Sequence, residues 1–178
     1  MDGVIFLRSS AQCFERAREL AEGALAQVGD ADFPRVPAPG ANSLAVLVRH
    51  MSGNLCSRWT DFLTTDGEKP DRQRDHEFED EGLGRAELMA RWDESWDTCL
   101  RTLRTLRAGD LLRTVHIREE PWSVLAAIQR SLSHADYHTG QIVQLARHWV
   151  GDGWQCLSIP RGQSQAFLET MQARHRDA

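Results

Sequence analysis

Two histidines in the segment 133–142 have the spacing of a shared metal site. His134 and His138 are four residues apart, so on a helix both imidazoles project from the same side. At roughly 100° per residue they lie about 40° apart, at the edge of an apolar arc that includes Leu145. A half-buried neutral imidazole needs partners for its ring nitrogens. A metal ion is one candidate, and ordinary hydrogen bonding between helix histidines is the other.

A third histidine, His50, lies in a second segment with helical periodicity. Apolar residues recur there at three- and four-residue steps. They are Leu44, Leu47, Val48, Met51, Leu55, Trp59 and Phe62. Three imidazoles from two facing helices would leave coordination positions open. That arrangement is typical of a catalytic or substrate-binding metal centre rather than a closed structural one.

Five further side chains are candidates for binding a substrate near these histidines, although the sequence assigns no catalytic residue. Asn54, Ser57 and Asp61 form a polar stripe with His50 on its helix, where they either orient substrate or make a solvated helix edge. Tyr137 flanks the site and either donates a proton or packs with its hydroxyl in water. Arg161 offers a guanidinium either to an anionic substrate or to a surface carboxylate.

The helical periodicity predicts an all-α fold, a four-helix bundle. The predicted helices cover about 5–28, 42–63, 85–106 and 121–150, with Asn42 or Ser43 as the cap of the second and Pro121 in the first turn of the fourth. The polar connection 64–83 has about twenty residues, more than antiparallel neighbours need, which indicates a crossover between the second and third helices. Residues 111–117 are predicted to form a short extended connector.

The C-terminal extension 154–178 is expected to include a short final helix. It carries apolar residues that should dock on the bundle. They are Trp154, Leu157, Ile159 and Phe167. Pro160 and Gly162 allow a sharp turn that presents Arg161.

Length and composition favour one domain, residues 1–178, with a sizeable core, since 41% of the residues are hydrophobic. A net charge of -5 and the lack of a nucleic-acid reader motif argue against nucleic-acid binding. No apolar run has membrane-spanning length and the N-terminal segment is no secretory signal, so we expect a cytoplasmic protein that binds no membrane. The four scattered cysteines are expected to be reduced thiols.

Spacing excludes two classes of metalloenzyme. Ala135 stands where a His-Glu-x-x-His peptidase carries its glutamate, so that general base is absent. No Glu-x-x-His sequence occurs anywhere in the chain, which excludes the carboxylate-bridged di-iron bundle.

Three motifs in combination resemble the DinB/YfiT-like superfamily of metal-binding four-helix bundles. They are the segment 50–70 that begins His-Met-Ser-Gly-Asn, the segment Ser133–Ile142, and Leu-Ser-Ile-Pro-Arg-Gly-Gln-Ser at 157–164. The resemblance implies an up-down-down-up bundle, a divalent metal held by His50, His134 and His138, and frequent homodimers. Characterised members of that superfamily include metal-dependent thiol transferases and a mycothiol-dependent isomerase.

Two classes of function follow. The first is a metal-dependent enzyme that acts on a small molecule by thiol transfer or hydrolysis, with zinc or nickel as the metal and a low-molecular-weight thiol as a possible cofactor. The second is a non-catalytic metal-binding or structural protein whose ion ties two helices together. An open coordination position would favour the first class, and a fourth protein ligand the second.

Overall fold

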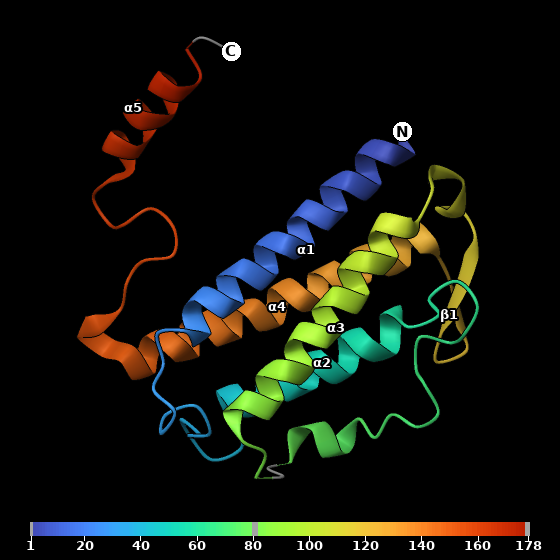
Figure 1. Cartoon of the computed structure of the whole chain (residues 1–178), viewed down its shortest axis with the longest axis horizontal. Coiled ribbons are helices and arrows are strands. Elements are labelled where there is room, and N and C mark those ends of the chain that lie inside the picture. The colour runs from blue at the N-terminus through green and yellow to red at the C-terminus, as the bar shows by residue number, and fades with distance from the viewer. Residues whose placement is uncertain (1, 80–81, 177–178) are drawn as a thin grey trace.

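The computed structural model describes residues 2–79 and 82–176 and is mostly helical (Figure 1). Four long helices form the body of the molecule: α1 (Gly3–Leu25), α2 (Leu44–Trp59), α3 (Arg85–Thr105) and α4 (Val124–Val150). Shorter helices are η1 (Asp75–Phe78), η2 (Ala108–Asp110), η3 (Gly151–Gly153) and α5 (Ser164–Arg174). The strands β1 (Thr114–Ile117) and β2 (Glu120–Ser123) form a two-stranded sheet, so the predicted helical fold is correct in outline but the fold is not purely helical.

Side chains cap the helices that carry the candidate site. The Ser43 hydroxyl accepts a hydrogen bond from the Val46 backbone N–H, as predicted for the start of the second helix. Ser123 caps α4 in the same way, so this helix begins after Pro121, which lies in β2 instead. The helix α2 ends at Trp59, four residues earlier than predicted.

The long helices pack in pairs, α1 mainly against α4 and α2 mainly against α3. In Figure 1, α1 and α4 run in one direction and α2 and α3 in the other. The core between them includes three fully buried tryptophans and Phe14, which packs edge-on against Trp59 at 5.5 Å between ring centroids. This contact joins α1 to α2, and Trp59 also donates a hydrogen bond to Ser131, which joins α2 to α4.

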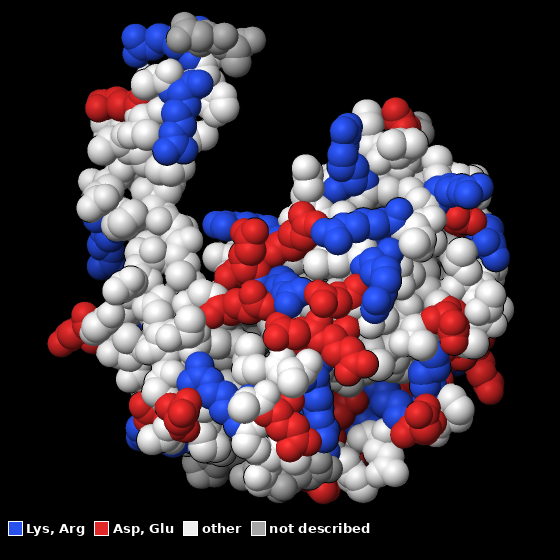
Figure 2. All heavy atoms as spheres, in the orientation of Figure 1, with Lys and Arg blue, Asp and Glu red and all other residues white. Residues whose placement is uncertain are grey.

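Paired charges cover the α1–α3 face of the bundle, where Figure 2 shows acidic and basic side chains intermixed. Arg18 of α1 donates hydrogen bonds to Asp93 and Asp97 of α3 at 2.8 and 2.7 Å. These charges pair with one another, and the candidate histidines lie between α2 and α4 instead.

The expected extended connector at 111–117 is one strand of a hairpin. β1 pairs antiparallel with β2, and Arg118 and Glu119 between them have φ values of 57° and 65°. The Asp66 carboxylate accepts hydrogen bonds from both of these backbone N–H groups, which stabilises the left-handed turn. The sequence prediction missed the second strand because it assigned Pro121 to a helix.

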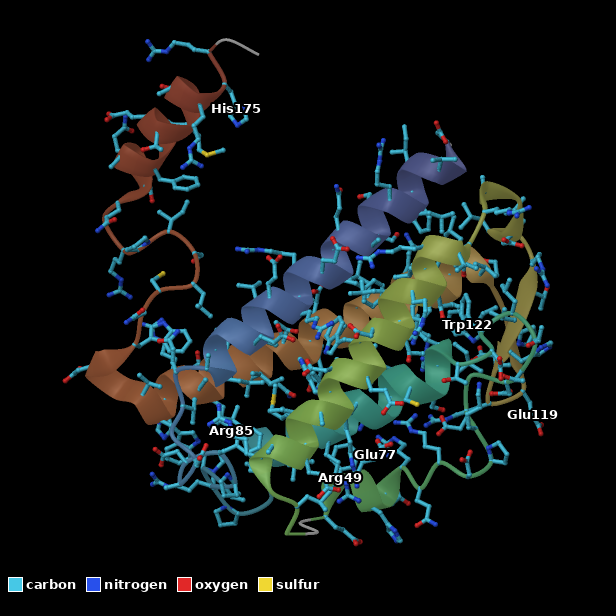
Figure 3. All side chains as sticks on the ribbon, in the orientation of Figure 1. Arg49, Glu77, Arg85, Glu119, Trp122 and His175 are labelled. Carbon is cyan, nitrogen blue, oxygen red and sulfur yellow. The ribbon has the colours of Figure 1, made fainter. Side chains whose placement is uncertain are left out.

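The connection between α2 and α3 folds onto the bundle. Its helix η1 packs against α2, and Glu77 in η1 is buried. In Figure 3 the Glu77 label lies between η1 and α2.

The C-terminal extension docks only by its first residues: the expected final helix is present as α5, but the expected docking holds for two of the four apolar residues and is wrong for the other two. Trp154 and Leu157 are partly buried against the core, whereas Ile159 and Phe167 are 39% and 46% exposed. None of the residues of α5 is buried. Figures 1 and 2 show α5 standing clear of the bundle.

Within the described ranges, no helix is both long enough and apolar enough to span a membrane.

Candidate metal centre

Three imidazoles meet between α2 and α4. His50 comes from the middle of α2, and His134 and His138 project from successive turns of α4. One ring nitrogen from each histidine lies within 4.8 Å of the other two. His50 and His138 are buried and His134 is half-buried. The prediction that these three side chains lie close enough to hold one ion is confirmed.

Hydrogen bonds orient two of the rings so that their Nε2 atoms face inward. His50 Nδ1 donates to Glu77 Oε2 at 2.8 Å, and His138 Nδ1 lies 2.8 Å from Gln141 Oε1. Because carboxylate and amide oxygens accept, both Nδ1 atoms carry the proton and both Nε2 atoms keep a lone pair. Partners of this kind are what metal-ligating histidines have on their outer nitrogen.

The inner nitrogens of His50 and His134 are close enough to share a proton or a metal ion. His50 Nε2 lies 3.3 Å from His134 Nε2. Two lone pairs at this distance repel each other unless a proton or a metal ion lies between them. With His138 completing the group, the donor set fits a divalent metal that accepts imidazole nitrogen.

The environment keeps the two α4 imidazoles neutral. Burial, followed by the nearby His138 and His50 and then Arg130, lowers the pKa of His134 to about 3. Burial and His50 also lower the pKa of His138, although its hydrogen bond to Gln141 acts in the opposite direction. Neutral imidazole is the form that binds metals, so both side chains are ready to act as ligands near neutral pH.

Glu77 is the main residue of this centre that the sequence prediction missed. Burial alone would raise its pKa, but hydrogen bonds from His50 and Arg72 hold the pKa below its usual value. Arg72 donates hydrogen bonds to both Glu77 carboxylate oxygens, at 2.7 and 2.8 Å. A Cβ atom added at Gly53 would collide with this carboxylate, so α2 accommodates Glu77 only because residue 53 is glycine. Phe78 packs on the other side of the His50 ring, 4.6 Å between centroids.

Hydrogen bonds from three arginines to Glu68 join the connection between α2 and α3 to α2 and to the hairpin. The Glu68 carboxylate accepts hydrogen bonds from Arg58 of α2 at 3.0 Å, from Arg72 at 3.2 Å and from Arg118 of the hairpin turn at 3.0 Å. Arg58 also donates to the Gly67 carbonyl. Since Arg72 contacts both Glu68 and Glu77, the network extends to His50.

The predicted polar stripe on α2 divides into three different environments. Asn54 is buried and lines a small cavity next to His134. The Ser57 hydroxyl donates to the Gly67 carbonyl at 2.8 Å and accepts from the Lys69 N–H at 3.1 Å, so it ties the connection to α2. Asp61 is exposed beyond the end of α2, where its φ is 49°.

The other two predicted substrate residues lie farther out. Tyr137 is 63% exposed, and its ring packs edge-on against His138 at 4.9 Å between centroids. Tyr137 and Gln141 line an open groove between α4 and the segment 37–47, with a volume of about 720 Å³. Arg161 is exposed on the segment that leads away from the bundle to α5. The structure therefore groups Asn54 and Tyr137 with the histidines and leaves Arg161 outside this group.

Comparison with known proteins establishes the family but no activity. Residues 2–163 match the family described as "Protein of unknown function (DUF1572)". No protein with a curated description matches the chain. A crystal structure of a protein described as "the conserved protein of locus from Enterococcus faecalis" is similar, with a TM-score of 0.62 and 19% identity over 82% of this chain and 97% of that one. At this identity the similarity shows the fold alone. The chain belongs to the DUF1572 family.

Proposed function

We propose that this protein binds one divalent metal ion through the Nε2 atoms of His50, His134 and His138, and that it is a metal-dependent enzyme acting on a small molecule. The observation that carries this proposal is the convergence of three ring nitrogens, two of them on rings whose outer nitrogens are held by Glu77 and Gln141. Within the described residues no fourth histidine, thiol or carboxylate joins this group. Three protein ligands are typical of catalytic zinc sites.

The arrangement of the helices supports placing the chain in the DinB/YfiT-like superfamily. Thr139 of α4 donates to the Ala17 carbonyl of α1, and Thr102 of α3 donates to the Trp59 carbonyl at the end of α2. With the directions visible in Figure 1, these contacts are those expected of an up-down-down-up bundle whose crossover is the connection between α2 and α3. Homodimers are frequent in that superfamily, and we extend this feature to the chain as part of the proposal, with zinc or nickel as the expected metal.

A bound divalent ion would supply Lewis acidity and would lower the pKa of a coordinated water or thiol towards neutrality. The protein contributes orientation and shielding. Glu77 and Gln141 fix the His50 and His138 rings, and the Phe78 side chain covers His50. We infer that Asn54, which lines the cavity next to His134, hydrogen-bonds the substrate and that Tyr137, which lines the groove beside His138, contacts it.

This geometry favours thiol transfer or hydrolysis over a purely structural ion. A structural zinc site is closed by four protein ligands, whereas this group has three. In the alternative, non-catalytic function, the ion would only tie α2 to α4, and the extensive network around Glu77 would serve stability alone.

Cobalt substitution separates the two functions. Protein loaded with Co²⁺ should respond to a small thiol, 2-mercaptoethanol, with a new sulfur-to-cobalt charge-transfer band, because an open position can accept the thiolate. The His134→Ala variant, treated identically, is the control and should show no such band. A Co²⁺-loaded wild-type protein whose spectrum does not change with thiol, azide or other exogenous ligands would mean a closed site and would favour the structural function.

A further inference from the structure

A small cavity adjoins the candidate metal centre on the side of His134. It is lined by Asn54 and Arg58 from α2, by Arg130 and His134 from α4, and by residues of the hairpin and the connection. Its volume is about 10 Å³, which is room for about one water molecule or one oxygen atom of a larger group. The cavity thus connects an arginine pair to a ligand of the proposed metal.

Arg58, which lines this cavity, has a buried donor with no acceptor among the described residues. The residue is 5% exposed, and its two terminal nitrogens donate to the Gly67 carbonyl and to Glu68. Its Nε is buried and has no hydrogen-bond partner among the described residues. A buried charged donor without an acceptor is costly, so an oxygen atom from outside the protein is expected to fill this position.

The charges around the cavity favour an anionic oxygen over water. Among the described residues no carboxylate lines the cavity, and Glu68, which balances Arg58, also pairs with Arg72 and Arg118. Arg130, at the exposed edge, is held with its guanidinium 5.6 Å from the centre of the Trp122 ring. A divalent ion on three neutral imidazoles would add two further positive charges beside this cavity.

We propose that this cavity is a carboxylate subsite, which takes one oxygen of the substrate's carboxylate onto Arg58 Nε while Arg130 contributes charge at the entrance. A carboxylate can insert a single oxygen into so small a space, and its planar head leaves less bulk at the entrance than a tetrahedral phosphate. The proposal rests on the proposed function for the identity of the ligand as a substrate, and it narrows that substrate to a small carboxylic acid. Arg58 and Arg130 thereby take the role that the sequence suggested for Arg161.

The subsite can be tested on metal-free protein, with acetate as the probe. In ¹⁵N-labelled protein at constant ionic strength, acetate should shift the Arg58 Nε–H resonance and the His134 ring resonances along one saturable curve. Arg130→Gln should weaken acetate binding about two- to fivefold, the effect of removing one exposed charge. The matched control is Arg113→Gln, because Arg113 is also exposed but pairs with Asp110 away from the cavity, and it should leave acetate binding unchanged.

A second variant tests the buried donor itself. Arg58→Lys keeps a positive charge but removes Nε, and it should reduce acetate binding at least about tenfold, as expected for loss of a charge-assisted hydrogen bond. Should this variant unfold, the Arg130→Gln and Arg113→Gln pair still decides the question.

An unchanged Arg58 Nε resonance in folded protein, or equal binding by the Arg130 and Arg113 variants, would overturn the subsite. Acetate binding by wild-type protein that takes up no Zn²⁺ or Co²⁺ when either metal is supplied would contradict the proposed metal function and leave the subsite intact.

Discussion

Two segments outside the four long helices differ in whether they pack on the bundle. The connection between α2 and α3 is polar, yet it folds onto α2 and buries Glu77. The C-terminal extension is more apolar, yet beyond Leu157 it is almost entirely exposed. From sequence alone we expected the C-terminal extension to dock on the bundle, and we predicted the first segment only as a polar connection.

The difference shows that matched partners, rather than hydrophobicity, decide which segment attaches. Each buried charge of the connection meets an opposite charge or a carbonyl, as Arg72 does with Glu68 and Glu77. No residue of α5 is buried in this way, and Phe167 and Leu168 are 46% and 48% exposed. A polar segment can thus be attached firmly and hold a metal ligand, while an apolar one without a complementary surface is not.

Among the substitutions that test this difference, Glu77→Ala should have the largest effect. Removing the carboxylate leaves the buried His50 without its partner and Arg72 with Glu68 alone, which should lower the free energy of unfolding by about 3–5 kcal/mol. Metal affinity should fall about 10–100-fold because the His50 ring loses its orientation. Urea denaturation and zinc titration measure the two effects.

The matched control for this variant is Asp75→Asn. Asp75 is two residues away, but its side chain is 94% exposed and pairs only with Arg74. Its loss should change stability by less than about 1 kcal/mol. Equal effects of the two substitutions would contradict the role given to Glu77.

Acid should weaken the attachment of the connection. Asp66, Glu68 and Glu77 all have lowered pKa values: burial raises them, but hydrogen bonds and the neighbouring arginines outweigh it. A depressed carboxyl pKa contributes stability that is present above the unfolded value and is lost as pH falls through the folded one.

Protonation of His134 also lowers the stability as pH decreases, and this effect begins at a higher pH than the effect of the carboxylates. Its pKa is about 3 in the folded protein against 6.5 unperturbed, so the unfolded chain binds its proton first as pH decreases. The unfolding free energy of metal-free protein should therefore fall from about pH 6.5 downwards and more steeply below about pH 4.5. His134→Gln should remove most of the decrease between pH 6.5 and 4.5, and an unchanged pH profile would contradict this assignment.

Two glycine substitutions on facing helices should change the free energy of unfolding in opposite directions. Gly53→Ala forces the Glu77 carboxylate away from its partners and should cost about 1–3 kcal/mol, the usual range for overpacking. Gly140→Ala on α4 meets no atom within 4 Å and should stabilise the protein by about 0.5–1 kcal/mol through helix propensity. Thermal unfolding of both variants measures the difference. A stabilising Gly53→Ala would show that the connection is not packed as described.

Removal of residues 164–178 should have the smallest effect. Because α5 buries none of its residues, the free energy of unfolding and the zinc affinity should change by less than about 0.5 kcal/mol. Urea denaturation of the shortened chain checks this. A loss above about 2 kcal/mol would mean that the extension is attached as firmly as the connection.

The sequence predicted the parts of the molecule that depend on local periodicity. The His134 and His138 pair, the position of His50 on a second helix and the Ser43 cap all follow from helical spacing and capping rules. Each of these signals lies within a few residues of the feature that it predicts.

The parts that failed depend on contacts between distant residues. Glu77 lies 27 positions from His50 in a segment without periodicity, so no local pattern pairs them. The hairpin turn uses Arg118 and Glu119, which are unusual turn residues, and it is supported by Asp66 some 52 positions earlier. Gly53 was the one local hint, since a glycine inside a helix often marks a close approach.

The most direct test of the metal centre is the metal content of protein purified without an affinity tag. Elemental analysis after dialysis should find one divalent ion per chain in the wild type and none in His50→Ala, whose circular dichroism should still show a helical bundle. His148→Ala is the control, because His148 is exposed on the same helix as His134 and lies outside the three-histidine group. Wild-type protein that retains no ion, or His50→Ala protein that retains a full equivalent, would contradict the three-histidine site.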